Sequence, residues 1–556
     1  MRKTTALLLA LVLIGGLAAA CTSDPSTSDG ENPGNPGPSG GGNGNNGGTP
    51  NGNPGEHFEI SIAHWEINSS FPDGAEDAVR DYIQEKFNVT IVPAGLSWAD
   101  NVPEMTSMWA ATGQLPDVTS AEICWTAQFR QWVEDDVIRS IPQSLYSKYP
   151  NINAIVAGDA AIQALMMDGE LWFIPRPSSG DPKDWFIERG IINRKDWRIA
   201  LGFDVPQTKQ DFIDLCAAYA TMDPKGDGSY TVGLSFDMPG FPFSQSFPTF
   251  GVTDFEWLPD ANGNWYVPAY EAFELGSFLR DIGRAGGLDP DFITYQANTD
   301  NSGTWKFANS QLGMLVVQPN INVIWRNIGA QFLALNPGTN LLDHIEILQP
   351  PTDGGSDPAA FITAAYWSEN YIRADVSDEK LDRILAMYDW LMSIEGQLMM
   401  NFGIEGTDWQ WDAAGDVELL TPINPNTGER EPASTIYPIL SGGFQYLGCW
   451  NADVEWFSPV VPKDLREYLL AELDFRKTNW TAKPTNYALA LEVVPEKDAI
   501  GHPWDFGMGF WAPFILDRSS ASNEELYESM RANMDAAGYA AAKEAMTARA
   551  REMGIN

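Results

Sequence analysis

Cysteine and histidine are scarce in this chain of 556 residues, which contains four of each. Beyond the N-terminal region only Cys124, Cys216 and Cys449 remain, so at most one disulfide can form among them. None has the CxxC spacing of a metal site, and we expect all three to be small buried residues. The histidines also lack metal-ligand spacing, and there is no GxSxG nucleophile elbow of the serine-hydrolase kind.

Basic residues are few: 34 Lys and Arg stand against 75 Asp and Glu, which gives a formal net charge of −41. Nucleic acid and anionic membrane surfaces are therefore poor partners, because the basic footprint that binds phosphate is missing. The simplest interpretation of this acidity is a solvated exterior. It also argues weakly against a uronate or another polyanion as the ligand.

Long hydrophobic runs are absent after residue 20, where no stretch offers 18 consecutive apolar residues. Residues 1–20 begin with Arg2 and Lys3 and continue with an apolar run too short for a spanning helix, which predicts an export signal. This signal ends in small residues directly before Cys21 and resembles a lipoprotein signal, which implies lipidation of Cys21. Conventional cleavage that leaves Cys21 free is the alternative. If Cys21 is lipidated, residues 21–56 consist of the lipidated cysteine and a disordered Gly, Asn and Pro tether.

The folded part opens with the pattern of a β-α-β unit. Residues 58–63 alternate as a strand, a helix follows with Asp73 and Glu76 as capping residues, and residues 89–92 form the next strand. Ligands gather at the C-terminal ends of strands in doubly wound sheets, which makes Trp65 and Glu66 candidate ligand contacts. A place in the core is the alternative for Trp65.

A second candidate wall follows the third predicted strand. Gly113 ends a helix of roughly residues 100–112, Pro116 prevents its resumption, and Val118 begins the strand. The strand leads into residues 120–125, whose end supplies Glu122 and Trp125 as further candidate ligand contacts.

The most specific pattern lies in residues 191–228. A buried strand and a short helix are followed by the turn LGFDVPQT, by a helix with Thr208 and Asp211 as a capping box, and by DPKGDG. This order resembles the extracellular solute-binding protein family 1, in particular the large carbohydrate ABC-transporter substrate-binding lipoproteins of Gram-positive bacteria (the aldouronate or LipO-like subfamily). ATGQLPDV at 111–118, GLDPDF at 287–292 and FGIEGTDW at 402–409 extend the resemblance along the chain.

The same comparison singles out two further groups of candidate ligand contacts. Trp367 and Glu369 follow the expected return of the chain to the first lobe, and we expect them to form a third wall near the hinge. The glycines of the FGIEGTDW loop allow it to aim Trp409 and Trp411 across a cleft, although such a loop can equally be structural.

The resemblance implies an α/β fold of the periplasmic-binding-protein type, class II, with two α/β lobes joined by hinge crossings. It assigns residues 57–187 and 346–556 to the N-terminal lobe and a C-terminal helical region, and residues 188–345 to the second lobe. It further implies a monomeric receptor, not an enzyme, lipid-anchored at the extracellular face of the cytoplasmic membrane. Such a receptor delivers an oligosaccharide to ABC transporter permease subunits, and the acidic charge favours a neutral sugar.

Two other functions remain open from the sequence. An oligopeptide or polyamine receptor would show an excess of acidic over aromatic groups in its cleft. A surface glycan-degrading enzyme would need two carboxylates about 5–10 Å apart, and pairs such as Glu122 with Glu369 arise by chance among so many acidic residues. A surface adhesin belongs to the same alternative.

Residues 223–229 imitate the start of an EF-hand-like calcium loop, and some alginate receptors of this superfamily hold calcium near this point. Lys225, however, occupies a ligand position between Asp223 and Asp227, and Leu234 stands where the bidentate Glu belongs. A plain turn is therefore favoured over a calcium site, and we expect no metal or other cofactor.

Overall fold

A computed structural model describes the chain in the ranges 55–97, 102–124, 126–178, 182–187, 189–237, 246–251, 256–295, 302–362, 366–425, 428, 430–449, 453–484, 489, 492–501 and 503–555. The predicted export signal, Cys21, nearly all of the tether, and Trp125 lie outside the described residues. Across the described ranges, every helix is too short or too polar to span a bilayer.

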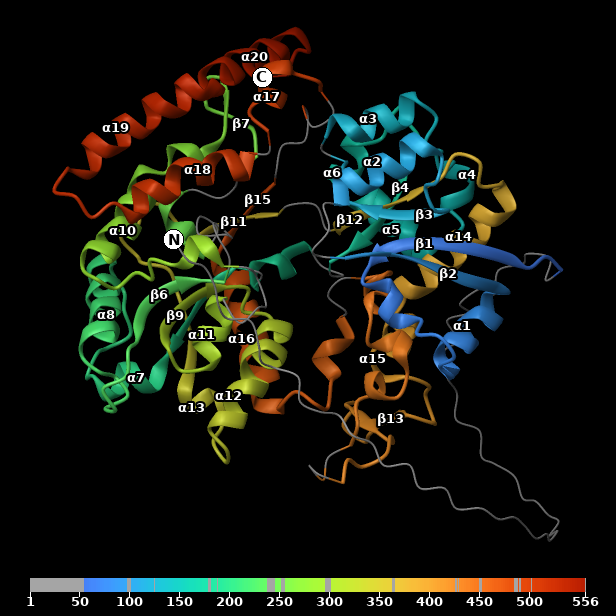
Figure 1. The fold of residues 1–556 in the computed structure, drawn as a ribbon, viewed down its shortest axis with the longest axis horizontal. Helices are drawn as coiled ribbons and strands as arrows, with labels where there is room; N and C mark the ends of the chain where they lie inside the picture. Colours follow the sequence, from blue (N-terminus) through green and yellow to red (C-terminus); the bar gives the residue numbers. More distant parts are fainter. Residues whose placement is uncertain are drawn as a thin grey trace, which may run out of the picture. The chain divides into compact units, whose positions relative to one another are not determined.

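The first lobe is built on a five-stranded sheet with the order β2, β1, β3, β12, β4 (Figure 1). β1 pairs in parallel with β2 and β3, whereas β12 runs antiparallel to both β3 and β4. The expected β-α-β start is therefore confirmed. The strands are β1 (Phe58–Trp65), β2 (Val89–Leu96), β3 (Val118–Ala121), β4 (Phe173–Pro177) and β12 (Tyr366–Ile372).

Helices bury their apolar faces against this sheet in one continuous core. The first of them begins later than the sequence predicted, because its N-cap is Asp77, whose carboxylate accepts the Arg80 backbone N–H at 2.9 Å, and not Asp73 or Glu76. The helices are α1 (Ala78–Phe87), α2 (Val102–Thr112), α3 (Ala127–Glu134), α4 (Gln143–Tyr146), α5 (Pro150–Gly158), α6 (Ala160–Ala164), α14 (Asp378–Met392) and α15 (Ile394–Phe402).

The second lobe has its own four-stranded sheet with the order β10, β5, β9, β6. β5 is antiparallel to β9 and β10, and β6 is parallel to β9. These strands are β5 (Gly190–Arg194), β6 (Val232–Phe236), β9 (Leu312–Val317) and β10 (Ile345–Leu348). Two mixed sheets of this kind confirm the predicted α/β fold of the periplasmic-binding-protein type.

The helices of the second lobe include α8 (Lys209–Thr221), which begins at the predicted capping box. Thr208 accepts from the Asp211 backbone N–H, and Asp211 accepts from that of Thr208, which satisfies two N–H groups at the helix start. The others are α7 (Lys195–Ala200), α10 (Phe273–Arg284), α11 (Gly303–Ala308), the π-helical turn η6 (Asn322–Gly329), α12 (Ala330–Leu335) and α13 (Leu341–His344).

The C-terminal helices complete the core of the second lobe. The buried side chains of Met534 and Tyr539 belong to the same cluster as Phe278 on α10, and the indole N–H of Trp511 donates to the Ala269 carbonyl at 2.9 Å. The second lobe is therefore larger than residues 188–345. These helices are α16 (Lys463–Asn479), α17 (Pro495–Ala499), α18 (Pro503–Leu516), α19 (Asn523–Met534) and α20 (Ala540–Glu552), and α18 lies beside α10 in Figure 1.

Short two-stranded sheets and 3-10 turns connect these parts. The small strands are β7 (Leu258–Pro259), β8 (Trp265–Tyr266), β11 (Ala359–Ile362), β13 (Trp409–Trp411), β14 (Val417–Leu419) and β15 (Thr481–Pro484). The turns used below are η1 (Ile67–Ser70) and η9 (Gly443–Tyr446), which contact one another in the first lobe.

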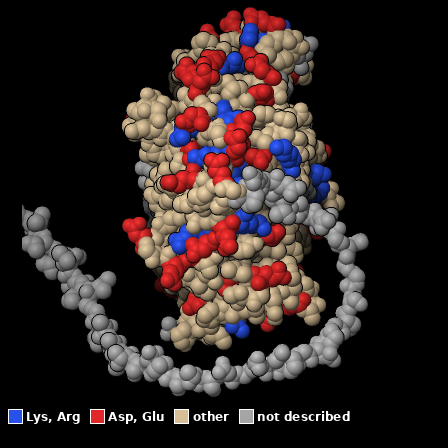
Figure 2. Space-filling view, turned by 90° about the vertical axis from the view of Figure 1, so that its right-hand side faces the viewer, with Lys and Arg blue, Asp and Glu red and all other residues tan. Residues whose placement is uncertain are grey.

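The acidic surface and the burial of the three cysteines agree with what the amino-acid composition indicated. Figure 2 shows acidic side chains scattered over one face, with fewer basic side chains between them. Cys124, Cys216 and Cys449 are buried, as predicted, and form no disulfide with one another.

The packing of α19 on the second lobe predicts a position-dependent loss of stability. Met534 has no exposed surface, so Met534→Ala leaves a cavity in the core and should lower the free energy of unfolding by about 2–5 kcal/mol. Met553→Ala is the matched control, because 41% of the Met553 side chain is exposed. Calorimetry of both variants checks this, and equal melting temperatures would contradict the assignment of α19 to this core.

Candidate functional site

Candidate side chains from several segments meet at one edge of the first sheet. β1 and β3 are parallel, with Ile62 opposite Val118, so both strands end at this edge. Antiparallel β12 begins there, since Tyr366 lies opposite Pro177 at the end of β4 and Glu369 lies opposite Ala121 at the end of β3. The sheet thus brings together four of the predicted site residues, Trp65, Glu122, Trp367 and Glu369.

Two tryptophans form a stacked pair at this edge. The rings of Trp65 and Trp367 have centroids 5.5 Å apart and an interplanar angle of 26°. Trp65 is 5% exposed and packs into a small apolar cluster behind the sheet edge, whereas Trp367 is only half-buried. The pair is therefore an aromatic platform whose more accessible ring is that of Trp367.

A β-bulge sets the direction of Trp367. Between Tyr366 and Glu369 the register of β12 against β4 shifts, because three steps along β12 match two steps along β4. Ser368 lies at this bulge with φ of 66°, a left-handed conformation that is uncommon for a residue with a side chain. β-Bulges change the direction of side chains next to binding sites. In this bulge Trp367 does not follow the regular alternation of side chains between the two faces of the sheet.

Arg176 on β4 lies behind the tryptophan pair, and it was missed in the sequence. Its side chain has no exposed surface, and its guanidinium carbon lies 4.4 Å from the ring centroid of Trp367 and 5.6 Å from that of Trp65. Burial lowers the pKa of Arg176 to about 9, so the group keeps its charge at neutral pH. A signal was present, since Arg176 is the one charged residue in the apolar strand of residues 172–177.

A buried polar chain extends from this arginine into the sheet. Nη1 of Arg176 lies 3.5 Å from Nε2 of His64, and Nδ1 of His64 lies 2.8 Å from Oγ of Ser120, which donates to Oδ1 of Asn370 at 2.7 Å. Because the guanidinium can only donate, we assign the imidazole proton to Nδ1. Burial and the Arg176 charge hold the pKa of His64 well below its usual range, in agreement with a neutral ring.

The two candidate carboxylates occupy different environments. The Glu122 side chain is exposed. Desolvation by the surrounding protein raises the pKa of its carboxyl, and the positive charge of Arg176 lowers it by less. Glu369 is 2% exposed and accepts hydrogen bonds from the Ile123 backbone N–H at 3.1 Å, from the Cys124 thiol at 3.0 Å and from the Tyr371 hydroxyl at 3.0 Å. Glu369 therefore holds the loop that carries Glu122, and Glu122 is the carboxylate that solvent reaches.

Glu66 lies at the turn that follows β1. It has φ of 55° and an exposed side chain, and its carbonyl accepts from the Ser69 and Gly443 backbone N–H groups at 3.1 and 3.2 Å. A Cβ atom on Gly443 would lie 1.7 Å from the Trp65 carbonyl oxygen, so only glycine allows η9 to approach the end of β1 so closely.

Trp409 and Trp411 lie on the separate β13–β14 hairpin. Trp409 is 2% exposed, packs in a small apolar cluster with Phe402, and donates its indole N–H to the Gly403 carbonyl at 3.1 Å. Trp411 is 42% exposed and meets Phe457 edge to face. In this conformation only Trp411 of the two presents its ring to solvent.

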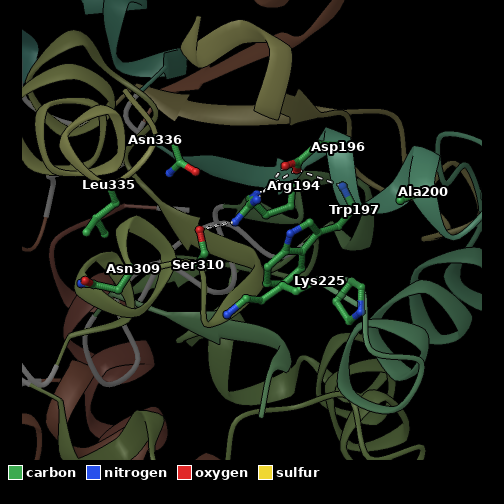
Figure 3. A pocket seen from close by; sticks show the side chains of 10 residues that line it. Arg194, Asp196, Trp197, Ala200, Lys225, Asn309, Ser310, Leu335 and Asn336 are labelled. Carbon is green, nitrogen blue, oxygen red and sulfur yellow. Dashed lines mark hydrogen bonds and ion pairs between the residues drawn. The ribbon is translucent and has the colours of Figure 1, made fainter. Parts of the chain in front are cut away.

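A pocket of about 470 Å³ lies at one edge of the second sheet (Figure 3). The pocket lies at the N-terminal ends of the parallel strands β6 and β9. Two lining residues show this, because Ser310 precedes β9 and Arg194 is the last residue of β5, which is antiparallel to β9. Arg194 donates to both carboxylate oxygens of Asp196, at 2.9 and 2.6 Å, and to Ser310 at 2.8 Å. The charges around this pocket are engaged with one another, and none of the predicted site residues lines it.

The loop of residues 223–229 does not fit calcium. The ammonium group of Lys225 lies 3.4 Å from the Asp227 carboxylate and therefore supplies a positive charge where an EF-hand has a ligand. Asp223 accepts from the Gly228 backbone N–H at 3.0 Å, and Leu234 is buried in β6. In the described residues, no three His, Cys, Asp or Glu side chains are grouped to hold a metal ion.

Comparison with known proteins finds relatives in sequence and in structure. No protein-family model matches the chain. The fructooligosaccharide ABC transporter substrate-binding protein FusA of Streptococcus pneumoniae serotype 4 is 28% identical over 139 residues, which span 24% of this chain and about a quarter (26%) of FusA.

Solved structures with the same fold cover most of the chain. FusA of S. pneumoniae in complex with kestose has a TM-score of 0.62 at 17% identity, over 89% of this chain and 99% of the other. The alginate-binding protein AlgQ2 without calcium ion has a TM-score of 0.60 at 16% identity, over 89% and 98%. An HMO binding ABC-transporter associated solute binding protein from Bifidobacterium longum infantis has a TM-score of 0.58 at 13% identity, over 88% and 98%. At these identities the likeness shows the fold.

The buried Glu369 predicts a stability that depends on pH. Burial first, and the nearby Glu122 charge in addition, raise its pKa from 4.5 to about 7 in the folded state. Between these two values the folded state binds the proton more tightly, so this carboxyl makes the protein less stable as the pH rises through that window. Glu369→Gln does not titrate and should gain up to about 3 kcal/mol on the wild type between pH 5 and pH 8.

Urea unfolding at several pH values measures this difference. Glu405→Gln, which removes an exposed carboxylate, is the control. A gap between wild type and Glu369→Gln that stays constant with pH would rule out titration of Glu369 in this range.

The Lys225–Asp227 pair predicts that calcium does not stabilise this protein. A ligand that binds the folded state raises the melting temperature, so neither EDTA nor millimolar calcium should change it in the wild type. Lys225→Asp, which adds a carboxylate at the third loop position, should lower the melting temperature in EDTA and recover part of the loss in calcium. A lower wild-type melting temperature in EDTA would contradict the role of Lys225.

Proposed function

We propose that this chain is the substrate-binding protein of a carbohydrate ABC importer. The observation that carries the proposal is the stacked pair of Trp65 and Trp367 beside the exposed carboxylate of Glu122, at the strand ends where ligands gather in such folds. Aromatic faces pack against the C–H faces of sugar rings, and carboxylates accept hydrogen bonds from sugar hydroxyls. The sequence likeness to the substrate-binding protein FusA supports the same function.

The carboxylates support binding without chemistry. A glycosidase needs two carboxyl groups that both face the sugar. Glu369 is instead 2% exposed and accepts its hydrogen bonds from within the chain, so it cannot take part beside Glu122 without losing the loop that it holds. The pair of Glu122 and Glu369 therefore does not favour a glycan-degrading enzyme.

The charge behind the platform argues against a cationic ligand. A polyamine would meet Arg176, whose guanidinium lies 4.4 Å from the Trp367 ring, and like charges close to a buried site repel one another. In the described residues the same edge offers two tryptophan rings together with two exposed carboxylates, Glu66 and Glu122, so acidic groups are not in excess over aromatic ones. A neutral oligosaccharide fits this combination better than an oligopeptide or polyamine.

The remaining parts of the proposal follow from the sequence. The ligand binds between the two lobes and shifts their equilibrium toward a closed form, which is presented to the permease subunits of the transporter. Lipidation of Cys21 anchors the protein, as a monomer, at the extracellular face of the cytoplasmic membrane. Membership of the aldouronate or LipO-like subfamily belongs to the same proposal, and so do contacts of the ligand with Glu66, Trp125 and Trp411.

A titration of ligands tests the function. Residues 57–556 are mixed with neutral, uronic and amino-sugar oligosaccharides and with peptides, while tryptophan fluorescence and heat of binding are recorded. A saturable response to neutral oligosaccharides, with the ligand mass unchanged afterwards, is expected. Shortened glycan would mean an enzyme, and a response to peptides or polyamines alone would mean a different receptor.

A variant of the platform makes the test specific to the site. Trp367→Ala should weaken oligosaccharide binding at least about tenfold, since a loss of about 1.4 kcal/mol of stacking is enough for that factor. Trp172→Ala is the matched control, because Trp172 is also half-buried in the first lobe and packs on its core away from the pair. Equal losses of oligosaccharide affinity in both variants would show that the tryptophan pair is not part of the binding site.

A further inference from the structure

We infer that Arg176 is the positioning residue of the ligand platform: it clamps the bulge in β12 and thereby fixes the orientation of Trp367 against Trp65. This inference deepens the proposed function and rests on it only where sugar binding is measured. Arg176 itself is buried and is not a ligand contact.

The guanidinium reaches three different segments at once. Nε donates to the Trp367 carbonyl at 3.2 Å and to Oγ of Ser368 at 2.9 Å, both in the bulge. Nη1 donates to the Tyr446 carbonyl of η9 at 3.2 Å and faces His64 at 3.5 Å. A planar group with five N–H donors in fixed directions therefore ties β12, η9 and β1 to β4.

The bulge needs such a clamp because its conformation is unfavourable. Ser368 has φ of 66°, and a residue other than glycine keeps this conformation only where its surroundings hold it. Arg176 holds both residues that are joined by the Trp367–Ser368 peptide bond. Its Nε donates to the carbonyl of Trp367 and to the hydroxyl of Ser368. The same guanidinium covers the Trp367 ring at 4.4 Å, so backbone and side chain are fixed by one group.

The geometry explains why lysine should not replace this arginine. A lysine keeps the positive charge near Glu122 and His64, but its ammonium group lacks the flat face and the fork of donors. Arg176→Lys should therefore leave the local charge in place while releasing the bulge. Trp367 would then lose its single orientation, and a ligand would have to fix that orientation on binding, at the cost of affinity.

Fluorine NMR of ligand-free protein labelled with fluorotryptophan tests the inference first. Trp65→Phe and Trp367→Phe assign the two platform resonances. Arg176→Lys should shift or broaden both of them, because the stacked geometry that sets their environment is lost. Unchanged resonances of Trp65 and Trp367 would overturn the inference.

Arg476→Lys is the matched control. Arg476 is 1% exposed, its guanidinium lies 4.6 Å from the Trp480 ring, and it donates to the carbonyls of Phe186 and Arg189 at 2.8 and 2.6 Å. It resembles Arg176 in burial and contacts but belongs to the second-lobe core. Arg476→Lys should change the Trp480 resonance and leave those of Trp65 and Trp367 in place. Equal changes of the platform resonances in both variants would mean general loosening and overturn the inference.

Oligosaccharide binding supplies the second readout. Arg176→Lys should weaken binding about tenfold or more through misplacement of Trp367, and Arg176→Lys with Trp367→Ala should bind no more weakly than Trp367→Ala alone. Additive losses would overturn the inference. If the wild type binds no oligosaccharide while its platform resonances still depend on Arg176, the proposed function fails and the positioning role stands.

A second variant keeps the test decisive if Arg176→Lys does not fold. Ser368→Ala removes one acceptor of Nε and keeps the arginine and the charge. It should shift or broaden the Trp367 resonance and weaken oligosaccharide binding by less than Trp367→Ala does. A Ser368→Ala protein with the wild-type Trp367 resonance would count against the clamp.

Discussion

The position of β12 constrains the rest of this structure. This strand lies between β3 and β4, so the first sheet is incomplete until the chain has built β5, β6, β9 and β10 and returned. The four-stranded sheet of the second lobe is therefore inserted between two neighbouring strands of the first, β4 and β12. Because β12 is antiparallel to its neighbours, it begins at the edge where β1, β3 and β4 end, and it carries Trp367 to that edge. The platform is a consequence of this topology.

Two sets of buried polar groups lie behind the platform. Arg176, His64 and Ser120 lead from the tryptophan pair to Asn370 in the centre of the sheet, and Glu369 ties β12 to the loop after β3. Buried polar groups stabilise one arrangement when each has its partner, because any other arrangement leaves some of them unsatisfied. The buried polar groups thus hold the back of the site in one arrangement, and Glu66, Glu122 and Trp367 are described site residues that solvent reaches.

Local signals in the sequence predicted much of the local structure, although the N-cap of α1 is Asp77 and not Asp73 or Glu76, and they did not predict long-range packing. The Thr208 capping box and the strand that begins at Val118 are fixed by neighbours within a few residues, so the sequence suffices for them. The sequence also placed Trp65 at a strand end and Trp367 in a wall near the hinge, but their stacking and the Arg176 clamp depend on register between strands far apart in the chain. The C-terminal helices pack against α10 of the second lobe. An amphipathic pattern in the sequence predicts that a helix buries one face, but not which element that face contacts.

The late completion of both cores has a consequence for biosynthesis. The first sheet waits for β12, and the second lobe waits for α19 and α20 at the end of the chain. A chain that emerges N-terminus first therefore exposes apolar strands and helix faces until α19 and α20 have been made, and contacts so distant in sequence form slowly. The excess of acidic residues, 75 Asp and Glu against 34 Lys and Arg, favours mutual repulsion between such unfinished chains. The acidity of this protein is thus as much a property of its nascent chain as of its finished surface.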